Sequence, residues 1–359
     1  MRVLKIVAVS SVCALFFVLF GTPSAKACTA IGLIDYAACN VPAFQALQRI
    51  AEGNIENQLN LAVIENRAGG AAAAPLTLFP TGRLARTTHD GYVTSLNGTP
   101  VPRSPGFKTD EASVFGTLEI NMSQWTPSGA NWKINIFGGY AEIDSDFDPV
   151  NGSTRGGSFA KNESLIYGVS SILSAGSTYM VVALTGFTGD TSGQIVGATA
   201  AGDANIKYDT HGIVGAATVG HSFAIGGDWY FDPRAGFSYG RFDGDDYVAN
   251  RNVAVLNTMY RAAAVNGSIG FFGKMTWGSM AFSPYVRGGV EERVTYDNEA
   301  LVTTGVGRFL FGEDSTFWNA SLGFNLQATA KMSVNAELYG RWSDDVETLG
   351  GKLGAKFRF

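Results

Sequence analysis

The most specific chemical motif in the chain is Gly236-Phe237-Ser238-Tyr239-Gly240, which matches the Gly-x-Ser-x-Gly pattern of serine hydrolases. In those enzymes the serine sits on a sharp turn between a strand and a helix, where its hydroxyl is exposed. Here the pentapeptide lies inside a stretch with strand-like alternation, so the motif lacks the context that a nucleophile needs. A hydrolase is therefore only a minor alternative, and we expect no catalytic residue and no enzymatic activity.

Side chains that could bind a metal ion are few. The chain has three histidines: His89, His211 and His221. Their spacing is not that of a zinc site or a catalytic triad. Asp144, Asp146 and Asp148 alternate like the first ligands of a calcium loop, but Pro149 and Arg155 stand where that motif needs a glycine and a glutamate. We expect neither a metal site nor a cofactor.

The amino-terminal end reads as a secretory signal peptide, with a basic start, an apolar stretch over 6–20 and small residues up to Ala27. We expect cleavage after Ala27. The apolar stretch has about 15 residues, fewer than the roughly 20 that a membrane-spanning helix needs, so a permanent anchor is the minor alternative. Lipidation at Cys28 is a second alternative, which the charge of Lys26 disfavours.

Export also determines what the cysteines can do. Cys13 leaves with the signal peptide, while Cys28 and Cys39 remain in a compartment where disulfides form. We predict a small disulfide loop between these two residues. The rest of the chain has no cysteine, which excludes thiol catalysis and cysteine metal sites there.

Composition then limits the fold. Residues 1–27 hold three of the 26 basic residues and none of the 31 acidic ones, so the remainder is acidic and favours no nucleic-acid partner. With 46% hydrophobic residues the chain is too apolar for disorder, yet no later segment is long enough for a membrane helix. The other structure that satisfies every backbone group in lipid is a closed sheet.

Alternation supports this expectation. In the last segment, Leu349, Leu353 and Phe357 alternate with polar residues that include Lys352 and Lys356. The same period of two extends over 318–328 and 332–342. Further strands are expected over 113–123, 132–143, 164–173, 178–187, 208–223, 228–242, 268–277 and 280–294.

The connections between these strands alternate in length. Tight turns are expected at 174–177, 224–227, 278–279 and 329–331, and long loops at 144–163, 188–207, 243–267 and 295–316. Short and long connections alternate in this way in outer-membrane barrels, which have an even number of strands and tight turns on the periplasmic side. Eleven segments therefore need a twelfth, which we place near 84–97. The sequence predicts an all-β fold, a transmembrane antiparallel up-and-down β-barrel of about 12 strands with a short N-terminal helix; ten strands is the alternative.

The last 230 or so residues resemble the autotransporter β-domain, the translocator barrel of that family. The resemblance rests on four segments: Asn131 to Tyr140, Asp232 to Tyr239, Ser283 to Arg287, and Asn335 to Phe359. It implies that Phe357 and Phe359 belong to the C-terminal signal that the barrel-assembly machinery recognises. Fewer than 90 residues separate Cys28 from the barrel, too few for the β-helical passenger that such translocators normally carry.

A helix is predicted over 42–67, with Asn40 as its cap and Gly69-Gly70 at its end. The resemblance implies that this helix could plug the pore, with Glu56 and Glu65 as counter-charges. A periplasmic helix without specific contacts is an equal alternative. The residues expected to face the lumen are Lys133, Arg234, Glu337, Arg341, Lys352, Lys356 and Arg358.

We therefore divide the chain into a signal peptide (1–27), a segment with the disulfide loop and helix (28–83) and an outer-membrane barrel (84–359). The expected partners are outer-membrane lipid, lipopolysaccharide and the barrel-assembly machinery, and the protein is expected to be monomeric. The function expected is structural, surface or translocator-like. The alternative is a porin-like channel, in which basic lumen residues would favour small anions.

Overall fold

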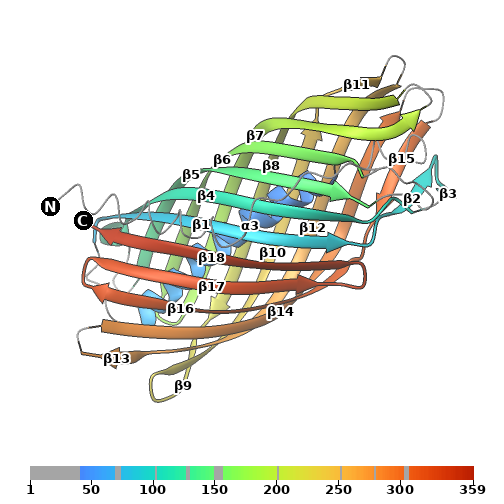
Figure 1. Ribbon diagram of the computed structural model, residues 1–359. Coiled ribbons are helices and arrows are strands. Elements are labelled where there is room, and N and C mark those ends of the chain that lie inside the picture. Colours follow the sequence, from blue (N-terminus) through green and yellow to red (C-terminus); the bar gives the residue numbers. More distant parts are fainter. Residues whose placement is uncertain are drawn as a thin grey trace.

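The computed structural model describes residues 41–68, 74–101, 103–126, 130–148, 157–199, 202–250, 253–278, 280–302 and 307–359. The expected signal peptide, Cys28, Cys39, the cap Asn40 and Gly69-Gly70 lie outside these residues. Within them, one long helix is surrounded by antiparallel strands (Figure 1). No helix in the described part of the chain has the length and apolarity needed to cross a bilayer.

Twelve long strands form the wall, as the alternation predicts. Their bounds are β1 (Leu76–His89), β4 (Phe107–Asn121), β5 (Ala130–Phe147), β6 (Phe159–Ala175), β7 (Thr178–Thr199), β8 (Gly202–His221), β10 (Trp229–Gly244), β12 (Val253–Gly273), β14 (Met280–Val302), β16 (Thr316–Thr329), β17 (Met332–Trp342) and β18 (Val346–Arg358). Each pairs with the next in antiparallel register, and β18 pairs back with β1. Closure leaves the wall without an edge strand, as lipid requires.

Short strands extend the two ends of the wall. β9 (Phe223–Gly226) and β13 (Met275–Trp277) lie at the end with the tight turns and the C-terminus, which we call the turn end (Figure 1). β2 (Val93–Leu96), β3 (Thr99–Val101), β11 (Tyr247–Asn250) and β15 (Gly307–Gly312) lie at the opposite end, the loop end. A short 3-10 helix, η1 (Ser123–Trp125), stands between β4 and β5.

Several expectations about boundaries were wrong. The long loops expected over 243–267 and 295–316 are mostly strand, because β12 begins at Val253, β14 continues to Val302, and β11 and β15 lie within these segments. The long loop expected over 188–207 is mostly strand, because β7 continues to Thr199 and β8 begins at Gly202. Inward residues such as Ile195 and Ile206 stay buried there, while the outward face becomes polar, so pairing continues beyond the apolar belt. The twelfth strand is β1, which begins at Leu76 rather than near 84.

The two faces of the wall follow the alternation. On β18, Lys352 and Lys356 are buried on the inner face, whereas Leu349 on the outer face is 67% exposed. On β16 and β17, Leu322 and Leu338 lie opposite each other on the outer face, and each is 59% exposed. This outer apolar surface suits contact with lipid.

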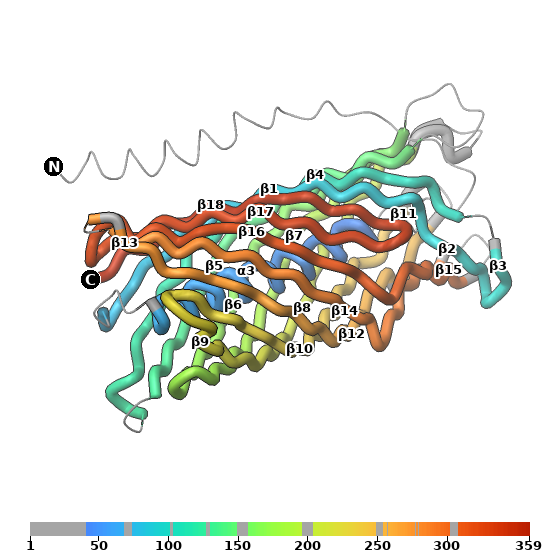
Figure 2. The backbone as a smooth tube through the Cα atoms, turned by 90° about the horizontal axis from the view of Figure 1, so that it is seen from below, coloured from blue at the N-terminus to red at the C-terminus, as the bar shows by residue number. Residues whose placement is uncertain are grey.

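The helix α3 (Val41–Ala68) runs along the inside of the barrel (Figures 1 and 2). It begins at the loop end, where Val41 packs with Tyr92 and Phe311, and it ends at the turn end, where Arg67 donates to the Ser222 carbonyl (3.1 Å). Its apolar residues pack on one side of the wall. Two clusters do this: Phe44, Leu47 and Ile50 with Phe137, Phe187 and Phe242, and Ile55, Leu59 and Val63 with Ile172, Val181 and Phe272.

Candidate functional site

The turn end of α3 is held by a cluster of charges. The Glu65 carboxylate accepts bonds from Lys133 (3.0 Å), Lys356 (3.1 Å) and Arg358 (2.7 Å). Glu119 on β4 shares the two ammonium groups, at 3.0 Å from each. All five side chains are almost completely buried, so each charge depends on its partners for the solvation that water would supply. We call this group the Glu65 cluster.

In the middle of the barrel, Asn60 joins the helix to two wall clusters. Its carbonyl oxygen accepts from Arg234 (2.5 Å), which also binds Asp232 (2.8 Å). Its amide donates to Glu337 (3.4 Å), which binds Lys352 (2.6 Å). Because both clusters come from the wall, Asn60 is oriented from two sides.

The Asp232 and Glu337 carboxylates have further partners on neighbouring strands. Arg287 and the Tyr179 hydroxyl (2.5 Å) also donate to Asp232. The Tyr285 hydroxyl donates to Glu337 at 2.8 Å. These buried carboxylates are thus well supplied with donors, which is what keeps buried charges stable in a protein interior.

Nearer the loop end, helix and wall share a third group of charges. Arg49 of α3 and Arg83 of β1 both bind Glu111 of β4, at 2.5 and 2.9 Å. Arg341 of β17 binds Glu291 of β14 at 2.8 Å. Glu111 thus binds two guanidinium groups, and Glu291 binds one.

At the loop end, Gln45 of α3 is the centre of a buried network. Its carbonyl oxygen accepts from the Tyr92 hydroxyl (3.0 Å), and its amide donates to Glu313 (2.6 Å). Glu313 follows β15 and also binds Arg293, while His89 Nε2 lies 3.6 Å from its other oxygen. Burial raises the pKa of the Glu313 carboxyl, but Arg293 and His89 offset this and bring the pKa to about 2.

Short strands also lie at the loop end of the wall (Figure 1). β2 pairs with β15, although they belong to connections far apart in the chain, and β2 turns into β3 through Asn97-Gly98. Both turn residues have positive φ, 51° and 81°, which is the two-residue turn that asparagine and glycine favour. Beneath the strands, Tyr92 and Phe107 pack with Val41. We call β2, β3 and β15 the cap.

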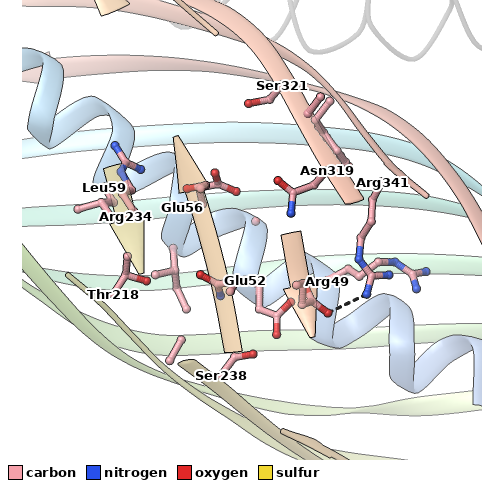
Figure 3. A pocket seen from close by; sticks show the side chains of 18 of the residues that line it. Arg49, Glu52, Glu56, Leu59, Thr218, Arg234, Ser238, Asn319, Ser321 and Arg341 are labelled. Carbon is pink, nitrogen blue, oxygen red and sulfur yellow. Dashed lines mark hydrogen bonds and ion pairs between the residues drawn. The ribbon is translucent and has the colours of Figure 1, made fainter. Parts of the chain in front are cut away.

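A cavity of about 170 Å³ lies between α3 and the wall (Figure 3). Basic side chains contribute to its lining: Arg49, Arg83, Arg234, Arg341 and Lys352. Its lining includes Glu52 and Glu56 of the helix. The facing wall contributes polar side chains, among them Thr218, Ser238, Asn266, Ser268, Asn319 and Ser321. Liquid water takes about 30 Å³ per molecule, so the space is large enough for several waters.

The side chains expected to face the lumen all make ion pairs within the barrel. Lys133, Lys356 and Arg358 belong to the Glu65 cluster; Arg234, Glu337, Arg341 and Lys352 lie further along the helix. Of the expected counter-charges, Glu65 has three cationic partners, but Glu56 takes part in no ion pair among the described residues.

Several acidic partners were missed from the sequence. They are Glu111, Glu119, Asp232 and Glu291, all on wall strands. Alternation could have found Glu119, since it shares the inward face of β4 with Ser113 and Thr117. The partner of each acid could not be read from the sequence, because it depends on which strands become neighbours.

The Gly-x-Ser-x-Gly motif lies inside a strand, as the alternation predicts. Ser238 is within β10, buried against the cavity, and no strand-to-helix turn surrounds it. The described residues contain no group of three His, Cys, Asp or Glu side chains that could hold a metal ion.

Phe357 and Phe359 lie at the turn end. Phe359 is 66% exposed, and its backbone N–H donates to the Leu76 carbonyl (3.0 Å).

Comparison with known proteins agrees with this architecture. The family model described as autotransporter β-domain matches residues 101–338. No match was found among curated protein sequences.

Among solved structures, the translocator domain of NalP from Neisseria meningitidis aligns with a TM-score of 0.61 at 13% identity, over 90% of this chain and 99% of that one. The β-domain of the Bordetella autotransporter BrkA gives 0.57 at 18% identity, over 79% and 100%. The transport unit of AIDA-I from Escherichia coli gives 0.57 at 15% identity, over 80% and 91%. These three similarities show the shared barrel fold.

Proposed function

This chain belongs to the autotransporter β-domain family, and from that premise we propose that it is a translocator barrel that retains its own helix α3 as a plug. Barrels of this family are outer-membrane proteins, and the closed wall with its apolar outer surface is of that kind. The translocator role therefore belongs to the family, and the plugged state is our proposal for this chain.

The observation that carries the proposal is that charges from the whole length of the wall converge on one helix. Glu65, Asn60 and Arg49 meet partners on strands that include β4, β5, β10, β17 and β18. Without the helix, Lys133 and Lys356 would share Glu119, and Arg358 would lose Glu65, its ion-pair partner among the described residues. An unpaired buried charge is unfavourable, so these charges on the wall favour a barrel that contains the helix.

The direction of the helix supports the translocator role. In outer-membrane barrels the tight turns face the periplasm, so the loop end of this barrel faces outward. Because α3 begins at the loop end, its amino terminus lies toward the outer side. The helix therefore has the direction of a segment that has crossed the membrane through the pore.

We also propose the partners and processing that this location implies. A signal peptide over 1–27 would supply export, and lipopolysaccharide would contact the outer surface near the loop end. Barrels of the family rely on the barrel-assembly machinery, and here Phe357 and Phe359 would be part of the signal that it reads. Barrel domains of this kind are not enzymes themselves, and the strand context of Ser238 supports the proposal that this protein is non-enzymatic. We also propose that it is a monomer.

Limited trypsin digestion of the folded protein tests the plug. The Arg49 side chain is 9% exposed, so trypsin should cut exposed loops and leave the bond after Arg49 intact until the sample is boiled. Mass spectrometry of the fragments gives the cleavage sites. Rapid cleavage after Arg49 in protein that still shows heat-modifiable mobility would mean that the helix is outside the barrel.

The second candidate, a porin-like channel, is favoured by one observation. The cavity beside α3 shows that the helix does not fill the barrel, because its apolar contacts cover only one side of the wall. The remaining space is small, so any flow of solute with the helix in place is restricted to small species.

A further inference from the structure

The inner face of the wall is apolar at the loop end. There a buried cluster contains residues from β4, β5, β6, β7, β8, β11, β12, β14 and β15, whereas α3 contributes Val41. Each member is at most 6% exposed, so the cluster is shielded from water. We call this group the loop-end cluster; its members include Tyr92, Ile206, Phe309 and Phe311.

The outer face of the wall at the same level is polar. Ile206 of β8 is 2% exposed in the cluster, while its neighbours Asn205 and Lys207 are exposed on the outside. Further along β8 the outward residues are apolar, as Ile213 and Val219 show. A barrel interior that holds water is polar, so an apolar inside with a polar outside is instead the pattern of a dry core.

Fewer strands surround the interior at this end. The last residues of β14, from Glu299 to Val302, pair with β15, and β15 pairs with β2, which follows β1 in the chain. Nearer the turn end, β16, β17 and β18 lie between β14 and β1. One short strand thus takes the place of three. The diameter of a barrel falls with its number of strands, so side chains can fill the interior here.

Aromatic rings occupy this narrower end. Phe309 and Phe311 point inward from β15 and are each 2% exposed, while Leu310 between them is 38% exposed on the outer face. The Phe311 ring centroid lies 5.9 Å from that of Tyr92, which lies 5.3 Å from that of Phe107 on β4. The rings therefore connect β15 with β4 across the interior, although the two strands are far apart in the chain.

We propose that the loop-end cluster is an apolar seal, which closes the outer end of the barrel to water and ions. A constriction lined by apolar side chains stops ions because it holds no water to hydrate them. The inference goes beyond the proposed function, since the seal is formed mainly by the wall and closes the barrel at a different level from the helix. An intact seal also argues against the porin-like alternative.

Currents through the purified full-length protein in planar bilayers test the seal. We expect no current from the unchanged protein in KCl. The double variant Phe309→Ser, Phe311→Ser removes two rings from the cluster and adds hydroxyl groups, so water enters and small single-channel currents should appear. Leu310→Ser is the matched control, because Leu310 belongs to the same strand but lies on the outer face; it should give no current.

Thiol labelling gives a second measurement with a smaller substitution. Ala300 is 1% exposed and lies opposite Phe309 in the pairing of β14 with β15. In the folded protein, Ala300→Cys should react with a charged thiol reagent far more slowly than Ser192→Cys, since Ser192 is exposed on the outer face of β7. Adding the two serine substitutions should bring the rate at position 300 close to that at position 192.

The possible results separate this inference from the proposed function. A current through the unchanged protein, or labelling of Ala300→Cys as fast as that of Ser192→Cys, overturns the seal. A double variant that keeps heat-modifiable mobility but passes no current also overturns it, because the helix would then close the barrel by itself. The plug is judged separately by trypsin cleavage after Arg49, which the double variant should leave blocked. Rapid cleavage there contradicts the plug and leaves the result for the seal unaffected.

Discussion

The Glu65 carboxylate of α3 lies 3.1 Å from the ammonium group of Lys356 on β18, across a sequence separation of 291 residues. The pair joins a helix from the start of the described chain to the strand that closes the barrel. Since β18 also pairs with β1, the strand that closes the wall is also a strand that binds the helix. The contacts of Glu65 are therefore complete only when the barrel is closed.

Replacing Glu65 by glutamine should loosen the turn end of the helix. Lys133 and Lys356 would then share Glu119, and Arg358 would lose its carboxylate partner. Loss of one partner from a buried ion pair costs about 3–5 kcal/mol. We expect the folded form on unboiled gels to be lost at a lower temperature. Glu163→Gln on the outer face is the control and should behave as the unchanged protein. Equal melting of the two variants would show that the Glu65 cluster does not stabilise the barrel.

Acid should weaken the cap through Glu313. Its pKa is lowered from an ordinary value of 4.5 to about 2 in the folded protein, so ionised Glu313 contributes stability above about pH 4.5. That contribution is lost as the pH falls from 4.5 toward 2. Protease cleavage of the β2–β3 hairpin should accordingly increase over this range. In Glu313→Gln the cleavage should already be faster at pH 7 and should depend less on pH; a variant with the original pH profile would refute this assignment.

A charge on the apolar belt should prevent stable insertion. Leu322 is 59% exposed on the outer face and lies opposite Leu338, so Leu322→Arg places a guanidinium in lipid. The cost near the middle of the bilayer is about 2–4 kcal/mol. We expect less heat-modifiable protein in outer-membrane fractions, while Leu322→Ala inserts normally. Normal insertion of the arginine variant would place this surface outside the membrane.

The C-terminal aromatic should matter for assembly more than for stability. Phe359 is 66% exposed, and its bond to Leu76 uses the backbone, so Phe359→Ser removes little packing. We expect the variant to accumulate poorly in the outer membrane of cells, yet to refold in detergent and melt like the unchanged protein. A matching loss of thermal stability in detergent would instead indicate that Phe359 is a structural residue.

Much of the wall could be predicted from the sequence because alternation is local. The residues of a strand that point toward lipid must be apolar. The sequences of β16, β17 and β18 show this pattern by themselves, without knowledge of any other part of the chain. The strand ends were less predictable. β7 and β8 continue past the belt, where an outward polar residue such as Asp190 or Asp209 carries no sign that pairing goes on.

The sequence by itself determined that the chain forms a barrel, that it has a helix before it, and that Lys352, Lys356 and Arg358 lie on one face of the last strand. Only the tertiary structure decided where that helix lies and which acid each base meets. Glu65 and Glu56 are both acids of α3, yet the first binds three cations and the second none in the described structure. The difference depends on which strands surround each turn of the helix, and a periodic pattern contains no information about contacts between residues hundreds of positions apart.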